Sequence, residues 1–189
     1  MTKRTGLMNK KKREDKNRMK NARLMLLAAL LASASLANAQ NIVRWKTVVG
    51  LITAPNVDNP VAGSSIHSGT SPWTTRGGYA TVNLATGALA FNVEGLVLNG
   101  GDFSGTLPPG FPNVVGTLVC NPGSTNAAQP QAILDTPQVS IDQQGNADFS
   151  GNLVGIPPAQ CTNPLFLIRL PTLGGRWIAN GAVRTTNSQ

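Results

Sequence analysis

The sequence after residue 39 predicts an all-β fold, and we expect an antiparallel Greek-key β-sandwich, with a closed β-barrel as the alternative. Residues 40–189 contain one lysine, one glutamate and no methionine, so strong helix formers are scarce. Glycine and proline recur every few residues, which is typical of short strands joined by turns. No segment in this part shows the 3.6-residue apolar period of an amphipathic helix.

The expected strands follow one another at a spacing of roughly ten residues, as in sandwiches and barrels. A long loop rich in Pro, Gly, Ser and Thr is expected over 54–78. The expected strands are 42–53, the hairpin 79–84 with 89–98, then 114–120, 132–134, the hairpin 139–141 with 147–153 across a turn at 142–145, and finally 165–170 and 176–184.

The hairpin over 79–98 shows the clearest alternation in the chain. Leu89, Phe91 and Val93 occupy one side of its second strand, which we expect to face the core. The opposite side carries Glu94 and is expected to face water. Gly95 interrupts the alternation and is interpreted as a bulge.

Residues 1–39 have the three parts of a secretory signal peptide, which we expect to precede the β domain as a helix. A basic segment, 1–23, is followed by an apolar segment, 24–36, and then by the small-x-small site at 37–39. The apolar run is shorter than the roughly 20 residues that a membrane-spanning helix needs. We therefore expect an exported protein, extracellular or periplasmic, that is not an integral membrane protein after cleavage.

Cleavage before Gln40 leaves a single domain, 40–189, which is an ordinary domain length. The basic segment is long for a signal peptide. Met19 opens a signal of ordinary length, so translation from Met1 and translation from Met19 are both open.

The formal net charge of +8 belongs to the signal segment. Residues 1–39 hold ten of the sixteen Lys and Arg, whereas residues 40–189 carry six bases and six acids and are neutral. Nucleic-acid binding requires a basic surface that neutralises phosphates. We therefore expect no nucleic-acid partner.

Cys120 and Cys161 are the only cysteines, and both lie in the part expected to be exported. An even number of cysteines in an oxidising compartment indicates a disulfide. Two cysteines and one histidine cannot supply four zinc ligands, so we expect no metal site and no cofactor.

His67 is the only histidine, and no G-x-S-x-G nucleophile motif accompanies it. We expect it to be an exposed loop residue. Paired carboxylates suit glycoside hydrolysis, and Asp58 and Asp102 are the candidate loop acids for a hydrolase. No spacing predicts that they meet, so we expect the protein not to be an enzyme.

Trp73 is the candidate ligand-binding residue, because it lies in the polar loop where a flat ring can stack on a sugar. The alternative is that Trp73 folds back over the end of the sandwich and closes the core. The other two tryptophans lie in the terminal strands and are expected in the core.

The segments GYATVNLATGALAFNVEGLVLNGG, VSIDQQGNADFSGNL, FLIR and RWIANGAVR resemble those of small secreted bacterial β-sandwich proteins of uncharacterised function. The strand Thr86–Phe91, with its T-G-x-x-x-F pattern, and the Gly-Leu pair at 95–96 are similar to the CHRD domain, a secreted β-sandwich module. The resemblance implies a secreted β-sandwich and assigns no activity or site residue.

Taken together, the sequence leads us to expect an exported, non-enzymatic envelope or extracellular protein with a structural or interaction-mediating role. Its partner is unknown, with an envelope protein or a glycan as the two classes considered. A carbohydrate-binding module that uses Trp73 is the first alternative, and a hydrolase that uses Asp58 and Asp102 is the second.

Overall fold

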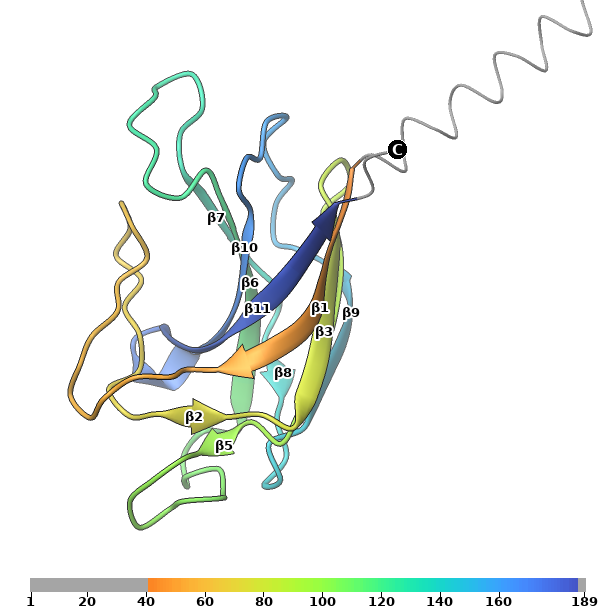
Figure 1. The fold of residues 1–189 in the computed structure, drawn as a ribbon. Coiled ribbons are helices and arrows are strands. Elements are labelled where there is room, and N and C mark those ends of the chain that lie inside the picture. The colour runs from red at the N-terminus through yellow and green to blue at the C-terminus, as the bar shows by residue number, and fades with distance from the viewer. Residues whose placement is uncertain (1–40, 187–189) are drawn as a thin grey trace, which may run out of the picture. The chain divides into compact units, whose positions relative to one another are not determined.

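The computed structural model describes residues 41–186, and the expected signal segment 1–39 lies outside this range. The described part is built from β-strands with one short 3-10 turn, which confirms the predicted all-β fold (Figure 1). The elements are β1 Ile42–Gly50, β2 Trp73–Thr74, β3 Gly77–Asn83, β4 Ala88–Glu94, β5 Val97–Leu98, β6 Asn113–Cys120, β7 Ala132–Asp135, β8 Val139–Ser140, β9 Ala147–Asn152, β10 Leu165–Leu170, η1 Pro171–Leu173 and β11 Arg176–Thr186.

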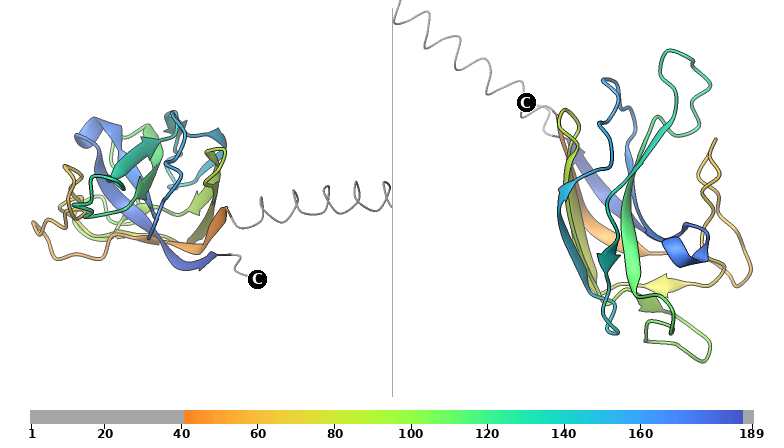
Figure 2. Two further views of the ribbon diagram at one scale, coloured as in Figure 1. Left: turned by 90° about the horizontal axis from the view of Figure 1, so that it is seen from above. Right: turned by 180° about the vertical axis from the view of Figure 1, so that it is seen from behind.

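Nine of these strands form one antiparallel sheet in the order β7-β6-β10-β11-β1-β3-β4-β9, with β8 paired to β6. The chain crosses the sheet between β4 and β6, returns between β8 and β9, and crosses again between β9 and β10, so that long connections join non-neighbouring strands as in Greek-key arrangements. The sheet is strongly curled, so its β6–β10 half faces its β3–β4 half (Figure 2). Strands β2 and β5 form a separate two-stranded sheet across one end.

The hairpin of β3 and β4 forms with the predicted faces. Thr81 lies opposite Ala90, and Ala80 lies opposite Phe91. Leu89, Phe91 and Val93 are each 2% exposed or less, because this side of β4 faces the core. The other side of the same strand faces outward, as the alternation predicted.

The predicted second hairpin, 139–153, is wrong in its pairing. The turn itself forms, with the Gly145 N–H donating to the Asp142 carbonyl at 3.0 Å. Strand β8, however, pairs with β6, whereas β9 pairs with β4 and places Phe149 opposite Phe91. The turn therefore carries the chain from one half of the sheet to the other. β9 packs beside β4, where the rings of Phe149 and Phe91 stack with centroids 5.9 Å apart, and does not pair with β8.

Both terminal strands differ from prediction at one end. β1 stops at Gly50, where an added Cβ would clash with the backbone carbonyl of Trp73. Beyond it, the Leu51 N–H turns to donate to the Ile178 carbonyl at 2.8 Å. β11 extends two residues past the predicted end at residue 184, because its last residues pair with the start of β1.

The core lies between the two halves of the curled sheet. Phe166 of β10 packs against Trp45 of β1 at 5.8 Å and against Phe91 of β4 at 5.6 Å between ring centroids. Gly116 of β6 leaves room for both Phe rings. A second, small apolar cluster lies on the outer side of β6 and β10, where the loop between β1 and β2 covers the sheet; its buried members are Val61, Ile66, Val119 and Leu167.

Candidate functional site

Trp73 is buried at one end of the curled sheet. Its side chain is 4% exposed, and its backbone pairs with Leu98 in the two-stranded sheet. A ring this deeply buried presents no face on which a sugar could stack. Of the two expectations for Trp73, the structure agrees with the second and not with sugar stacking: the ring joins the core and closes one end of it.

A hollow of about 200 Å³ lies beside the buried ring of Trp73. Its lining is mostly apolar and includes Leu98, Phe111 and Leu173. Arg176 is the one charged lining residue. Its Nη1 donates to the Ser68 carbonyl at 2.6 Å.

Asp58, His67 and Arg176 form a cluster that fastens the loop between β1 and β2 to the sheet. His67 Nδ1 lies 2.5 Å from Asp58 Oδ2. The other carboxylate oxygen, Oδ1, accepts from the Ser68 N–H at 3.1 Å and lies 3.7 Å from Nη1 of Arg176. The Trp177 N–H donates to the His67 carbonyl at 2.9 Å. No sequence pattern predicted that His67 contacts Asp58.

These contacts keep Asp58 ionised. The hydrogen bond with His67 is the largest cause that lowers the pKa of Asp58, and the Ser68 N–H and the charge of Arg176 lower it further against the cost of desolvation. A carboxyl with a lowered pKa is a poor proton donor, so it does not suit the general-acid role in glycoside hydrolysis. Asp102 is exposed and, within residues 41–186, forms no hydrogen bond or ion pair with Asp58.

A carboxylate that holds an imidazole is also part of a Ser–His–Asp triad. The neighbouring Ser68 hydroxyl does not complete one, because it donates to Oδ1 of Asp58 at 3.5 Å and not to the imidazole of His67. In the described part of the chain, no hydroxyl is hydrogen-bonded to His67. The arrangement therefore anchors the loop, and it presents no activated nucleophile.

Cys120 and Cys161 form the predicted disulfide, which joins the end of β6 to the loop between β9 and β10. Next to it, Asn121 is 3% exposed and satisfies all its polar atoms within the protein. Its amide nitrogen donates to the carbonyls of Pro130 and Gln160, and its oxygen accepts from the Thr162 N–H at 2.7 Å. This end of the domain is thus fixed both covalently and by hydrogen bonds.

The outer side of β3, β4 and β9 carries a set of short polar side chains that we call the outer polar face. Strand pairing aligns them in rows: Tyr79 with Asn92 and Asp148, then Thr81 with Ser150 on either side of Ala90, with Asn152 in the next row. Successive rows on one strand are two residues apart, or about 6.8 Å. Within residues 41–186 none of the polar side chains of this face has a hydrogen-bond partner. The face consists of Tyr79, Thr81, Asn92, Asp148, Ser150 and Asn152.

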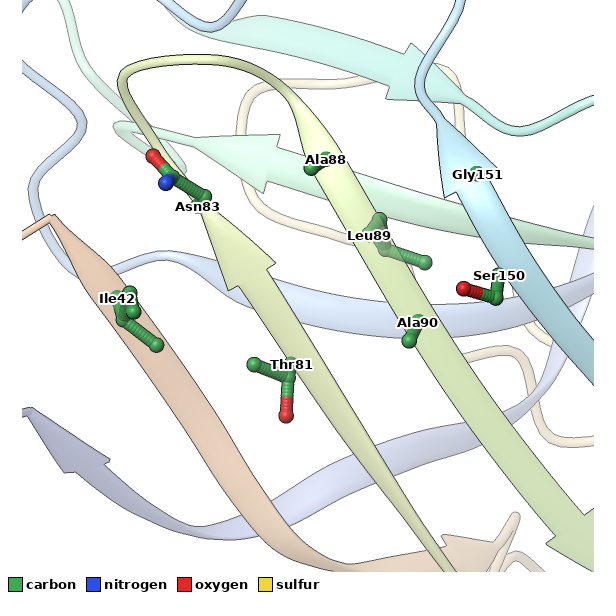
Figure 3. A pocket seen from close by; sticks show the side chains of 8 residues that line it. All are labelled: Ile42, Thr81, Asn83, Ala88, Leu89, Ala90, Ser150 and Gly151. Carbon is green, nitrogen blue, oxygen red and sulfur yellow. The ribbon is translucent and has the colours of Figure 1, made fainter.

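A hollow of about 220 Å³ lies on the outer polar face (Figure 3). Ala90 lies at its middle, with Thr81 on one side and Ser150 on the other. On this side of the sheet β4 contributes only the methyl groups of Ala88 and Ala90 to the lining, so the hollow lies between the side chains of Thr81 and Ser150 on the neighbouring strands. Its lining reaches from Ile42 on β1 to β9.

Residues 41–186 contain no group of three or more His, Cys, Asp or Glu side chains that could hold a metal ion. The same part of the chain contains no helix that is long and apolar enough to cross a membrane.

The sequence predicted only part of the outer polar face. The alternation in 88–94 predicted that one side of β4 faces water. The pairing of β4 with β9, which brings Asp148 and Ser150 alongside, links residues nearly sixty positions apart and has no local signal.

No family model, curated protein or solved structure matches this chain.

Proposed function

We propose that the protein is exported and acts in the cell envelope or outside the cell as a non-enzymatic, interaction-mediating protein. The outer polar face carries this proposal. It presents six polar side chains without partners in the described structure, on a rigid part of the sheet and around a hollow. A site on paired strands is held more precisely than a site on loops, which favours recognition.

Two features support export. Residues 1–39 have the composition of a signal peptide. The disulfide between Cys120 and Cys161 is of the kind that persists in oxidising compartments.

Export is tested by expressing the full chain in its native host and fractionating the cells. We expect the processed protein in the periplasm or the medium, with its N-terminus at Gln40 and its cysteines oxidised. An unprocessed chain that stays in the cytoplasm would contradict export.

Interaction through the outer polar face is tested in intact cells with a photo-crosslinking residue at position 150. The matched control is position 172, which is also exposed but lies in the 3-10 turn away from β9. We expect adducts from position 150 and none from position 172. Equal adduct formation at both positions would mean that the face has no special role.

A further inference from the structure

We propose that the outer polar face binds a chain segment of a neutral polysaccharide, with the ring of Tyr79 stacking on one sugar. This inference rests on the proposed interaction function and names the partner of the same face. It moves the expected carbohydrate contact from the buried Trp73 to Tyr79, which is 49% exposed.

The shape of the hollow fits a chain better than a single sugar. Its lining extends from Ile42 on β1 across β3 and β4 to Ser150 on β9. Three strand-to-strand spacings amount to about 14 Å. The hollow is open and shallow, and Ala88 and Ala90 form its floor, so an extended ligand can lie across the strands without entering the core.

The polar groups of the face match those of sugars. The hydroxyls of Thr81 and Ser150 and the amides of Asn92 and Asn152 can each donate and accept. Sugar hydroxyls have the same double capacity. Because these side chains have no partners in the described structure, a ligand can bond them without breaking internal hydrogen bonds.

The charges favour a neutral ligand. None of the residues that line the hollow is charged. Around it, Arg44 lies beside Thr81, whereas Asp148 and Glu94 are acidic and exposed. Lys46 is exposed on the same side of β1 as Arg44, so the face carries two bases and two acids and has no net charge to attract a uronate chain or a phosphodiester.

A protein partner, including a second copy of this chain, suits the face less well. Protein interfaces draw most of their binding energy from buried aromatic or arginine residues in well-packed pockets. Here the middle of the hollow is formed by alanine methyl groups, and its one flanking aromatic residue, Tyr79, lies a row away.

The test uses the exported and processed product of the full chain, and isothermal titration calorimetry. The ligands are neutral linear hexasaccharides of β-1,4-glucose, β-1,4-xylose, β-1,4-N-acetylglucosamine and β-1,3-glucose, with an oligogalacturonate as the anionic comparator. We expect at least one neutral hexasaccharide to bind and the oligogalacturonate not to bind. Failure of every neutral chain to bind, or binding of the oligogalacturonate alone, would overturn the proposal.

Two variants locate the site. Tyr79→Ala removes the stacking ring, and Phe103→Ala is the matched control, because Phe103 is 48% exposed in a loop away from the face. Ala90→Leu fills the hollow without deleting a polar group. We expect affinity to fall at least tenfold in Tyr79→Ala and in Ala90→Leu, and to stay unchanged in Phe103→Ala, with thermal unfolding showing that all three fold.

Unchanged binding in both face variants would place the sugar elsewhere and refute the proposal. A dimer in light scattering that Ala90→Leu dissociates would likewise refute it, because the face would then be an interface between copies. These outcomes are distinct from failure of the proposed function. Export together with crosslinking at position 150 would persist if only the choice of a glycan were wrong.

Discussion

Replacing Gly116 by alanine tests whether the sheet is curled as described, with β6 pressed against β4. A Cβ at this position would lie 2.8 Å from Cε1 of Phe91 and 3.2 Å from a ring carbon of Phe166. Both rings are fully buried and pack on each other, so neither can move freely. Overpacking of this kind typically costs about 1–3 kcal/mol.

Alanine also restricts the unfolded chain more than glycine does, and this offsets about 0.4–1 kcal/mol of the loss in stability. We therefore expect Gly116→Ala to lower the free energy of unfolding by about 1–2 kcal/mol. For a domain of this size, each kcal/mol shifts the melting temperature by about 2–4 °C. The melting temperature should therefore fall by about 2–8 °C.

The assay is urea unfolding followed by tryptophan fluorescence, with the disulfide intact. Gly77→Ala is the matched control: Gly77 is also a strand glycine, but an added Cβ there meets nothing within 4 Å. We expect the control to keep or raise the unfolding midpoint. A double variant, Gly116→Ala with Phe91→Leu, should lose less stability than the sum of its two parts, because the smaller side chain makes room. If Gly116→Ala behaved like the control, the close approach of β6 and β4 would be refuted.

Three other predictions concern the loops. Asp58→Asn should destabilise the protein at neutral pH. Folding lowers the pKa of Asp58, so the ionised carboxylate contributes to the free energy of unfolding above the unfolded pKa of about 3.9, and this contribution is lost as the pH falls through the folded pKa. The unfolding curves of wild type and variant should therefore converge in acid. A difference that stays constant with pH would contradict the contact with His67. Replacing both Cys120 and Cys161 by alanine should lower the free energy of unfolding by about 4 kcal/mol, because the disulfide closes a loop of 41 residues. A loss under about 1 kcal/mol in urea unfolding would contradict this prediction. In Asn121→Gly the glycine can adopt the φ of 52° found at this position, but the side-chain amide hydrogen bonds are lost. The free energy of unfolding should therefore fall by about 1–3 kcal/mol, measured from the urea midpoint. An unchanged midpoint would argue against the hydrogen bonds of Asn121.

Local patterns predicted the parts of the fold that depend on neighbouring residues. The alternation of Leu89, Phe91 and Val93 predicted the buried side of β4, since a strand turns every second side chain to the same face. The apolar run over Leu165–Leu170 predicted β10 with its observed bounds. The disulfide followed from the count of cysteines alone.

Pairings between distant segments could not be predicted in the same way. The turn at 142–145 was visible, but the partners of β8 and β9 depend on the stacking of Phe149 on Phe91 across the sheet. Trp73 lies in a polar stretch of sequence, and only the packing of β2 against β5 shows that its ring is buried. Asp58 and His67 are nine residues apart in an irregular loop, and such a loop has no helical or strand periodicity from which their contact could be predicted.

The most direct test of glycan binding by the outer polar face is a titration of the exported, isotope-labelled protein with the neutral hexasaccharides, followed by amide chemical shifts. We predict shifts concentrated on β3, β4 and β9, near Thr81, Ala90 and Ser150. Shifts around Trp73 instead, or no shifts with any neutral glycan, would contradict it.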